Sequence, residues 1–458
     1  MSIAAAAGND AFLVSAYSGT NGSGSLLSRA TVQALIASSG NSVVPVVLNG
    51  DVASMTIGLA NVNPMLHHAT TDAVTVIAKD AAGSTIVGPG GYLYPIVLAD
   101  SDTSGHSSLT KTTLNGPGDT TALLYDGGYG SGTLTASALG AAAPAPVSFF
   151  PLVATTETPL PAGHTAHEII VGPDGALWFV DSPLLLGRIT TSGALTQYAV
   201  PANWNPHSIC AGPDGAIWFT AQGTQFAYAA MIRRAPDGTY NVYQVGTPFA
   251  VGDCATGPDG NLYANFGSSL LQITPTGTVT TLALQDKSGN SIRVGSPIVG
   301  SPDGALWFVD TGYGALDRYD LTTHALTIYL VAVPFGAGGA PVSAVPAGVV
   351  LGPDKRFYFI AFFSIYASDT SGNITTVYPE TNGVGMSALG FAADASLWSG
   401  GGSTLAGMPT FLREFGGSLT PLLGTSAQSG FPFVDSIVSG PDGALWYARG
   451  TAIGRIVP

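Results

Sequence analysis

Apolar residues occupy two fixed positions on either side of a recurring polar turn in the last two-thirds of the chain. The turn is a Pro-Asp-Gly phrase or a close variant, and its seven copies place the aspartate at Asp174, Asp214, Asp259, Asp303, Asp354, Asp394 and Asp442. Ile, Val, Leu or Cys stands five residues before the aspartate, and Trp or Tyr stands four residues after it. Two apolar segments joined by a Gly-containing turn predict a pair of antiparallel strands.

The spacing of the copies predicts the architecture. Successive turn aspartates lie 40, 45, 44, 51, 40 and 48 residues apart, which is the length of a four-stranded propeller blade. Third and fourth apolar segments follow, as at 186–189 and 193–198. We therefore predict an all-β fold with a seven-bladed β-propeller over 147–458. The last blade lacks a fourth strand, and we predict that 153–160 supplies it and closes the ring.

The aromatic position of the repeat holds five of the six tryptophans. Because a residue that recurs in every unit is packed in the same way in each, we interpret this column as core between neighbouring blades and not as a ligand cage. The two cysteines, Cys210 and Cys254, lie at or next to the apolar position of their own repeats. We expect both to be buried free thiols.

The first 150 residues lack the repeat but also contain short apolar segments separated by turn signals. Strands are predicted at 11–17, 43–48, 52–59, 74–80, 81–86, 96–99, 122–125 and 134–137. This pattern is typical of β-sandwiches. We predict a partial or separate sandwich over 1–62 and a second sandwich over 63–146, which ends in an Ala- and Pro-rich linker. The phrase at 78–86 resembles bacterial immunoglobulin-like domains, so the second module is expected to be Ig-like.

Composition narrows the class of partner. The formal net charge is −14, so no basic surface is expected to neutralise the phosphates of a nucleic acid. No apolar run approaches the length of a membrane span, and the first residues lack the pattern of a signal peptide. Few lysines and abundant Ser and Thr suggest an exported protein, extracellular or periplasmic. We expect a monomer that binds a small molecule or a protein in the propeller funnel.

The inner strand of each blade is expected to begin at the central funnel, where binding sites gather. The residue seven before the turn aspartate marks this entrance, and its copies are His167, His207, Gly252, Ser296, Ala347, Ser387 and Asp435. The residue seven after the aspartate predicts a second ring, whose members are Asp181, Ala221, Phe266, Asp310, Ala361, Gly401 and Arg449. Ring closure makes the blades that carry Asp435, His167 and His207 neighbours.

Two histidines beside carboxylates can perform general acid–base catalysis, because imidazole titrates near neutrality. The same side chains can hold a divalent metal. The alternative without chemistry is that both histidines are solvated residues at the rim of the propeller.

The phrase Gly-Pro-Asp-Gly-Ala-Leu-Trp-Phe at 172–179, with the segment 187–198 that follows it, resembles the virginiamycin B lyase family over about residues 150–458. The resemblance implies a seven-bladed propeller that opens the ring of streptogramin B antibiotics. It also implies magnesium-dependent elimination at the ester without hydrolysis.

The catalytic phrases of that family match two segments of this chain. Ala166-His-Glu-Ile169 matches the first phrase and implies a catalytic role for His167, and Asn205-Pro-His-Ser-Ile209 implies one for His207. Asn205 and Gln222 stand where the family has glutamates, and an amide binds magnesium more weakly than a carboxylate and cannot act as a base. The pair also lies on the first two blades instead of the last two.

Two functions of different classes follow. The first is a lyase-like enzyme in which His167 or His207 removes a proton, with Asn205, Gln222, Asp181, Asp435, Asp310 and Arg449 as supporting residues and Mg²⁺ as the cofactor that the resemblance implies. The second is a non-catalytic exported propeller that binds a ligand or protein in its funnel, because a fold does not by itself imply a function.

Overall fold

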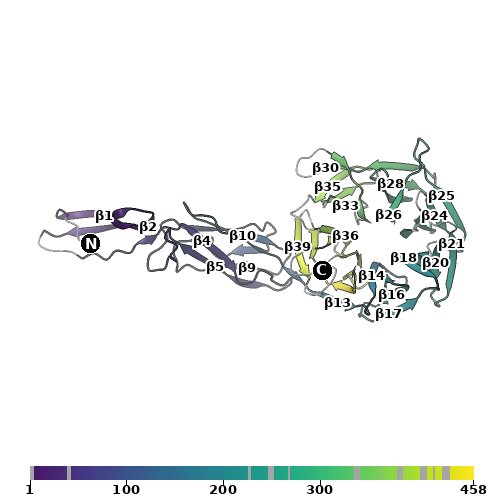
Figure 1. The fold of residues 1–458 in the computed structure, drawn as a ribbon, viewed down its shortest axis with the longest axis horizontal. Helices are drawn as coiled ribbons and strands as arrows, with labels where there is room; N and C mark the ends of the chain where they lie inside the picture. The colour runs from purple at the N-terminus through teal and green to yellow at the C-terminus, as the bar shows by residue number, and fades with distance from the viewer. Residues whose placement is uncertain are drawn as a thin grey trace. The chain divides into compact units, whose positions relative to one another are not determined.

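The computed structural model describes residues 5–38, 43–224, 228–245, 252–266, 269–334, 341–362, 364–378, 385–402, 410–415, 418–424 and 434–458. It comprises two compact units, Met1–Leu152 and Val153–Pro458, which Figure 1 colours in chain order. Apart from the short 3-10 turn η1 (Thr20–Gly22), all regular structure in these ranges is β-strand, which confirms the predicted all-β fold. No helix in them is long and apolar enough to cross a membrane.

The N-terminal unit contains a small sheet and a two-sheet sandwich. The small sheet consists of β1 (Gly8–Tyr17), β2 (Leu26–Ile36) and β3 (Asn49–Gly50). The sandwich sheets consist, in spatial order, of β4 (Ser54–Leu59), β5 (Thr70–Lys79), β9 (Thr121–Tyr125) and β7 (Ser107–Leu109), and of β11 (Val147–Phe149), β10 (Gly132–Ser137), β6 (Ile96–Asp100) and β8 (Thr113–Leu114). Buried Met55 and Leu123 of one sheet pack with buried Ile96 and Leu134 of the other and form the core.

The predicted boundary at residue 62 does not coincide with a division in the structure. β4 pairs antiparallel with β5 from Ser54↔Lys79 to Leu59↔Val74, so 54–59 belongs to the sandwich whose start was predicted at 63. The segment 43–48 forms no strand, whereas β2, which was not predicted, pairs with β1 along its length. An apolar pattern identifies segments that suit a strand, but strand pairing depends on the neighbours that a segment meets.

The C-terminal unit contains seven blades within the described residues, and each blade has four antiparallel strands. Blade 1 consists of β14 (Thr165–Val171), β15 (Leu177–Ser182), β16 (Leu185–Ile189) and β17 (Leu195–Ala199). Blade 2 consists of β18 (Trp204–Ala211), β19 (Ile217–Gly223), β20 (Ala229–Arg234) and β21 (Tyr240–Val245). Blade 3 consists of β22 (Cys254–Thr256), β23 (Leu262–Phe266), β24 (Ser269–Ile273) and β25 (Val279–Ala283). Blade 4 consists of β26 (Val294–Gly300), β27 (Ala305–Asp310), β28 (Ala315–Asp320) and β29 (Leu326–Leu330). Blade 5 consists of β32 (Ala347–Leu351), β33 (Phe357–Ala361), β34 (Ser364–Ser368) and β35 (Ile374–Tyr378). Blade 6 consists of β36 (Gly385–Phe391), β37 (Leu397–Gly402), β38 (Thr410–Phe415) and β39 (Ser418–Gly424). Blade 7 is β40 (Ser436–Ser439), β41 (Leu445–Arg449), β42 (Ala452–Ile456) and β13 (Thr155–Pro159). The hairpin of β30 (Ala332–Pro334) and β31 (Pro341–Ser343) joins blades 4 and 5, and β12 (Leu152–Val153) precedes β13.

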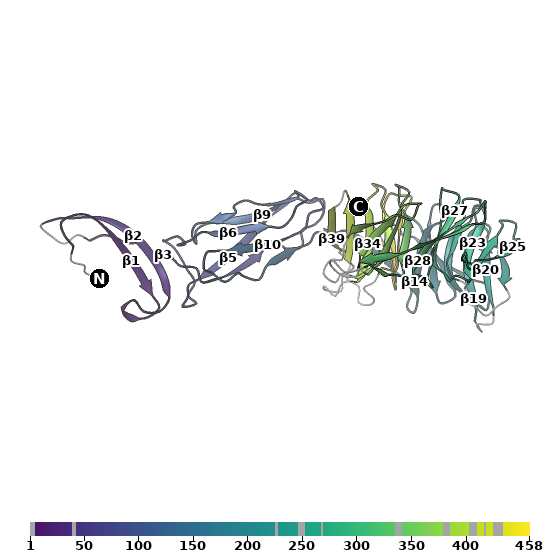
Figure 2. The ribbon, with the colours of Figure 1, turned by 90° about the horizontal axis from the view of Figure 1, so that it is seen from above.

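The blades form a closed ring. The inner strands β14, β18, β22, β26, β32, β36 and β40 contact one another in this order, and β40 contacts β14. Figure 1 shows the blades around the centre of this unit, and Figure 2 shows the same blades from the side. The seventh blade joins strands from both ends of the unit, because β13 pairs with β42 from Thr155↔Ile456 to Pro159↔Ala452.

The turn aspartate of the repeat connects the strands of its own blade. In blade 1, the two carboxylate oxygens of Asp174 accept hydrogen bonds from Trp178 Nε1 at 2.9 Å and from Arg188 Nε at 2.7 Å. Asp214 and Asp442 make the same two contacts with the tryptophan and arginine of their own blades. The tryptophans of the repeat are buried between blades, so the repeated phrase is scaffold.

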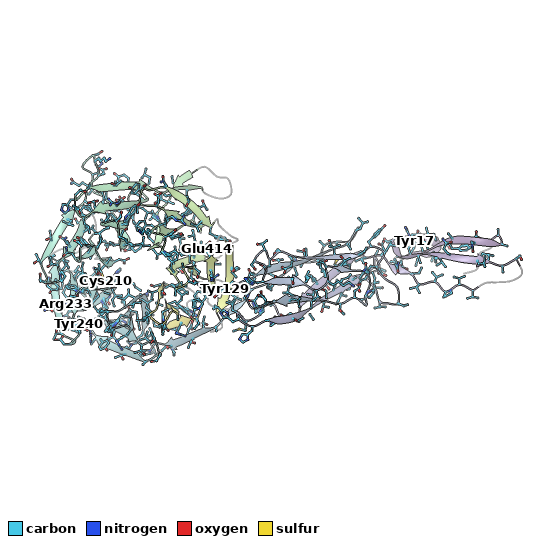
Figure 3. The ribbon with its side chains drawn as sticks, turned by 180° about the vertical axis from the view of Figure 1, so that it is seen from behind. Tyr17, Tyr129, Cys210, Arg233, Tyr240 and Glu414 are labelled. Atoms are coloured by element: carbon cyan, nitrogen blue, oxygen red, sulfur yellow. A yellow bond between two sulfur atoms is a disulfide. The ribbon has the colours of Figure 1, made fainter. Side chains whose placement is uncertain are left out.

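The prediction of free cysteines is wrong. Cys210 of β18 and Cys254 of β22 form a disulfide with a Cα–Cα distance of 5.8 Å, which joins blades 2 and 3. Figure 3 shows Cys210 nearer to the centre of the ring than Arg233 and Tyr240 of the outer strands of blade 2. The two cysteines are 44 residues apart in the chain, and only the contact between neighbouring inner strands brings them together.

Candidate functional site

A cavity of about 480 Å³ is lined by residues of all seven inner strands or of the segments that lead into them. One side of the lining is polar and comes from blades 7, 1, 2, 3 and 4. It is formed by Asp435, Ser436, His167, Glu168, His207, Asp253 and Ser296. The other side is mainly apolar and is formed by Pro297, Gly348, Val349, Val350, Ala388, Leu389 and Ile437, with Ser387 among them.

The first predicted ring therefore lies largely at this cavity. Its members His167, His207, Ser296, Ser387 and Asp435 line the cavity. In blades 3 and 5, the residue one place later in the chain, Asp253 and Gly348, lines it in place of the predicted member.

Irregular pairing of the inner strands explains why two consecutive positions reach the cavity. The register of β14, β18, β26, β32 and β36 shifts at this point, for example between His167 and Ile169 in β14 and between Pro206 and Ser208 in β18. A bulge inserts an extra residue into one strand, bends it and redirects its side chains. The positions seven and six before the turn aspartate are thus both presented to the funnel.

His167 and Asp435 form one close pair at the cavity. The distance between His167 Nδ1 and Asp435 Oδ2 is 3.7 Å, and the side chains are 51% and 38% exposed. Burial raises the pKa of the Asp435 carboxyl, and the nearby His167 opposes this shift. A carboxylate beside an imidazole restricts the orientation of the ring.

Glu168 and Asp253 form a second group of acids, close to His207. Glu168 is partly open to the cavity, and its Oε2 accepts a hydrogen bond from the backbone N–H of Ile209 at 3.0 Å. Burial of the carboxyl and the negative charge of Asp253 raise the pKa of Glu168, and the bonds from Ser208 and Ile209 oppose this. Burial also raises the pKa of Asp253, opposed by Ser296 and by the charge of His207.

Glu168 and Asp253 were not predicted as site residues, because the predicted ring comprises only the position seven before the turn aspartate. The position six before it holds Glu168, Ser208, Asp253, Pro297, Gly348, Ala388 and Ser436. Two acids in a column of small and apolar residues were the available signal. A regular strand would direct this position away from the neighbouring one; the bulge of β14 reverses that expectation for Glu168, and Asp253 lies just before the first residue of β22.

Three supporting residues of the second predicted ring lie elsewhere. Asp181 is fully buried, 3.0 Å from His164 Nδ1, and Asp310 is fully buried and accepts the backbone N–H of Gly312 at 2.7 Å. Arg449 is buried, and its Nη1 lies 3.0 Å from Glu157 Oε1 of the closing strand. These positions fall on the second strand of each blade, where the side chains pack within and between blades. None of the three lines the cavity.

Asn205 and Gln222 face each other across β18 and β19 as paired residues. Neither belongs to the described lining of the cavity. The described residues contain no group of three or more His, Cys, Asp or Glu side chains that could hold a metal ion. The two amides also carry no charge and therefore bind a divalent cation more weakly than the glutamates of the family would. The residues at these positions therefore do not fit the magnesium site that the resemblance implies.

The fold and the cavity define a seven-bladed β-propeller with acidic and imidazole side chains in its central funnel. Residues 151–334 match the model of the Virginiamycin B lyase family, and the predicted resemblance of the propeller to that family is confirmed. A comparison with curated proteins gives no match.

Solved structures share the fold at low identity. A catalytically inactive His-to-Ala variant of virginiamycin B lyase from Staphylococcus aureus with quinupristin is 21% identical, with 66% of this chain and 98% of that chain covered and a TM-score of 0.53. A streptogramin B lyase is 19% identical, with 66% and 96% covered and a TM-score of 0.54. The extracellular domain of a hybrid two-component system from B. thetaiotaomicron is 12% identical, with 66% and 39% covered and a TM-score of 0.51. Because proteins of different kinds share this fold, the fold alone does not assign the chemistry.

Proposed function

We propose that the funnel binds a cyclic ester of the streptogramin B type and opens its ring by elimination, with His167 or His207 as the base. The observation that carries this proposal is the convergence of two histidines and three carboxyl groups from four neighbouring blades on one cavity. Such a combination in a concave site supports acid–base chemistry.

The residues of the funnel supply each part of an elimination. A neutral imidazole removes the proton from the carbon next to the carbonyl group. The electron pair of that C–H bond forms a C=C bond, the C–O bond of the ester breaks, and the leaving oxygen departs as a carboxylate. No water is consumed. Asp435 orients His167, because His167 Nδ1 and Asp435 Oδ2 lie 3.7 Å apart.

A non-catalytic binding propeller is the second candidate. The presence of the amides Asn205 and Gln222 where the family has glutamates favours it. In that case the polar side of the cavity would bind a ligand without bond cleavage. The two candidates differ in product formation and not in binding.

Incubation of the full chain with a streptogramin B, followed by chromatography and mass spectrometry, tests the proposal. Elimination gives a linear product of unchanged mass, whereas hydrolysis adds the mass of water. We expect the unchanged mass, and a loss of about 100-fold or more in kcat when the base is replaced in His167→Ala or His207→Ala. His68→Ala, an exposed histidine outside the propeller, is the matched control and should keep full activity.

A wild-type protein that forms no product, in the presence or absence of added Mg²⁺, would exclude the enzyme and leave the binding propeller. Equal activity of both histidine variants and the control would exclude the assignment of the base. The magnesium dependence that the resemblance implies is tested in the same assay with EDTA.

We also propose that the protein acts outside the cytoplasm. The disulfide between Cys210 and Cys254 supports this, because disulfides persist in oxidising compartments. Alkylation of thiols in freshly lysed producing cells should leave both cysteines unmodified, and modification of both would contradict the proposal.

A further inference from the structure

We propose that Glu168 is a further catalytic residue of this funnel, whose protonated carboxyl donates a hydrogen bond to the substrate carbonyl, and that Asp253 is the positioning residue that keeps it protonated. This inference rests on the proposed elimination and adds the group that stabilises negative charge on the substrate carbonyl oxygen. The elimination needs such a component, because negative charge develops on the carbonyl oxygen when the proton is removed.

The backbone places Glu168 at the cavity in an unusual way. Its φ is +35°, in the left-handed region that non-glycine residues rarely adopt, at the point where the register of β14 shifts. Backbone strain of this kind costs free energy and clusters at functional sites. The neighbouring His167 also lines the cavity, so one bulge presents a base and an acid side by side.

Contacts with blade 2 hold the carboxyl in place. Oε2 accepts the backbone N–H of Ile209 at 3.0 Å. Ser208, the residue before Ile209, links blade 2 to blade 3, because its hydroxyl oxygen accepts a hydrogen bond from the backbone N–H of Cys254 at 3.2 Å. Cys254 follows Asp253 directly and is bonded to Cys210. Blades 1, 2 and 3 are therefore linked next to the two acids.

The charged groups around Glu168 favour its neutral form. Asp253 of blade 3 is the negative charge that acts on it, and its effect adds to that of burial in raising the pKa of Glu168. His207 of blade 2 acts on Asp253, and His167 of the same strand is paired with Asp435 of blade 7. On β15, the residues that pair around the bulge are the uncharged Val180 and Phe179. No lysine or arginine belongs to the described lining.

The proton balance of the step is complete. The histidine takes the proton from carbon, and the O–H of Glu168 hydrogen-bonds to the carbonyl oxygen while that oxygen carries the enolate charge. When the C–O bond breaks and the C=C bond forms, the charge leaves with the carboxylate product. Glu168 retains its proton, and the protonated histidine loses its own to solvent. A neutral carboxylic acid in a site of low polarity is a known hydrogen-bond donor for such an oxygen.

The chain allows a direct measurement of the Glu168 proton, because it contains only four glutamates. Carboxyl-¹³C glutamate labelling should give four titratable NMR signals, and Glu168→Gln identifies the one of interest by its loss. We expect that signal to titrate well above the ordinary value of 4.5 and to move to lower pH in Asp253→Asn. Asp237→Asn, at an exposed turn of blade 2, is the matched control and should not move it.

An ordinary midpoint for Glu168 in the wild type, or a midpoint that is the same in Asp253→Asn, would overturn the inference. This result does not depend on activity. It therefore separates a failure of the inference from an absence of lyase activity, which concerns the proposed function.

Kinetics test the role in the reaction. We expect Glu168→Ala to lower kcat about 100-fold with a smaller effect on KM. The wild-type activity should fall as pH rises through the midpoint measured by NMR. Glu168→Gln, which keeps a donor that does not titrate, should retain more activity than Glu168→Ala and lose this alkaline decline. An alkaline decline that persists in Glu168→Gln would show that another group is responsible and would overturn the catalytic role.

Discussion

The acidic residues of the propeller include two groups, whose carboxyl pKa values are shifted in opposite directions by their surroundings. Turn aspartates such as Asp174 and Asp442 accept hydrogen bonds from Trp and Arg side chains, and these bonds lower the pKa of their carboxyls against the effect of burial. Glu168 and Asp435 have raised pKa values because burial outweighs the groups that stabilise their charge. The first set stabilises the blades, and the second set is available for chemistry at the funnel.

Asp317 of blade 4 provides a prediction at this scale. Burial and the neighbouring Asp310 raise its pKa to about 8. Neither of its carboxylate oxygens has a hydrogen-bond partner within the described part of the chain. A raised pKa means that the folded state binds the proton more tightly than the unfolded state. The stability that this contributes is present below about pH 4 and is lost as pH rises to about 8.

We therefore expect Asp317→Asn, which cannot ionise, to melt at a higher temperature than the wild type at pH 8 and to lose most of this advantage at pH 4. Thermal unfolding followed by circular dichroism across this range is the measurement. An advantage that does not change with pH would contradict the role of the proton. Asp237→Asn, at an exposed turn, is the control for the loss of one charge.

Single strands decide both the closure of the ring and the shape of the site. The inner strands carry the bulges that turn two consecutive residues toward the cavity. The outer strand β13 closes the ring by its pairing with β42. Glu157 of β13 reinforces this pairing, because its Oε1 accepts hydrogen bonds from Tyr447 Oη at 2.8 Å and from Arg449 Nη1 at 3.0 Å.

Replacement of Glu157 by alanine should destabilise the whole propeller. Arg449 and Glu157 are 3% and 2% exposed, so the substitution removes the carboxylate from beside a buried guanidinium. Loss of one partner of a buried ion pair costs about 3–5 kcal/mol. Denaturant unfolding should show this loss, whereas Glu414→Ala, a glutamate of blade 6, should show a smaller one. A smaller loss of unfolding free energy in Glu157→Ala than in Glu414→Ala would mean that ring closure does not depend on the contact between Glu157 and Arg449.

The whole molecule places its chemistry where the ring brings distant segments together. Asp435 lies near the end of the propeller sequence and His167 near its start, yet they face each other after closure. The disulfide between Cys210 and Cys254 joins blades 2 and 3 on the side of the ring that carries His207 and Asp253.

Reduction of the disulfide should therefore affect both stability and the site. A cross-link typically contributes about 2–4 kcal/mol through its effect on the unfolded chain. We expect a reductant to lower the melting temperature and to shift the NMR midpoint of Glu168, since Cys254 follows Asp253 directly. The double variant Cys210→Ala, Cys254→Ala should behave like the reduced protein and should not respond to the reductant. An unchanged melting temperature after reduction would contradict this role.

The all-β class, the seven blades and the location of His167, His207 and Asp435 at the funnel entrance could be predicted from the sequence alone. These follow from a local repeat, because a regular period and a turn phrase impose the same strands in every unit. Only the folded chain shows the placement of Glu168 and Asp253 at the cavity, the disulfide, and the burial of Asp181, Asp310 and Arg449 away from the funnel. These depend on bulges and on contacts between blades. Such contacts join residues that are far apart in the chain, so the spacing of residues along the sequence does not predict them.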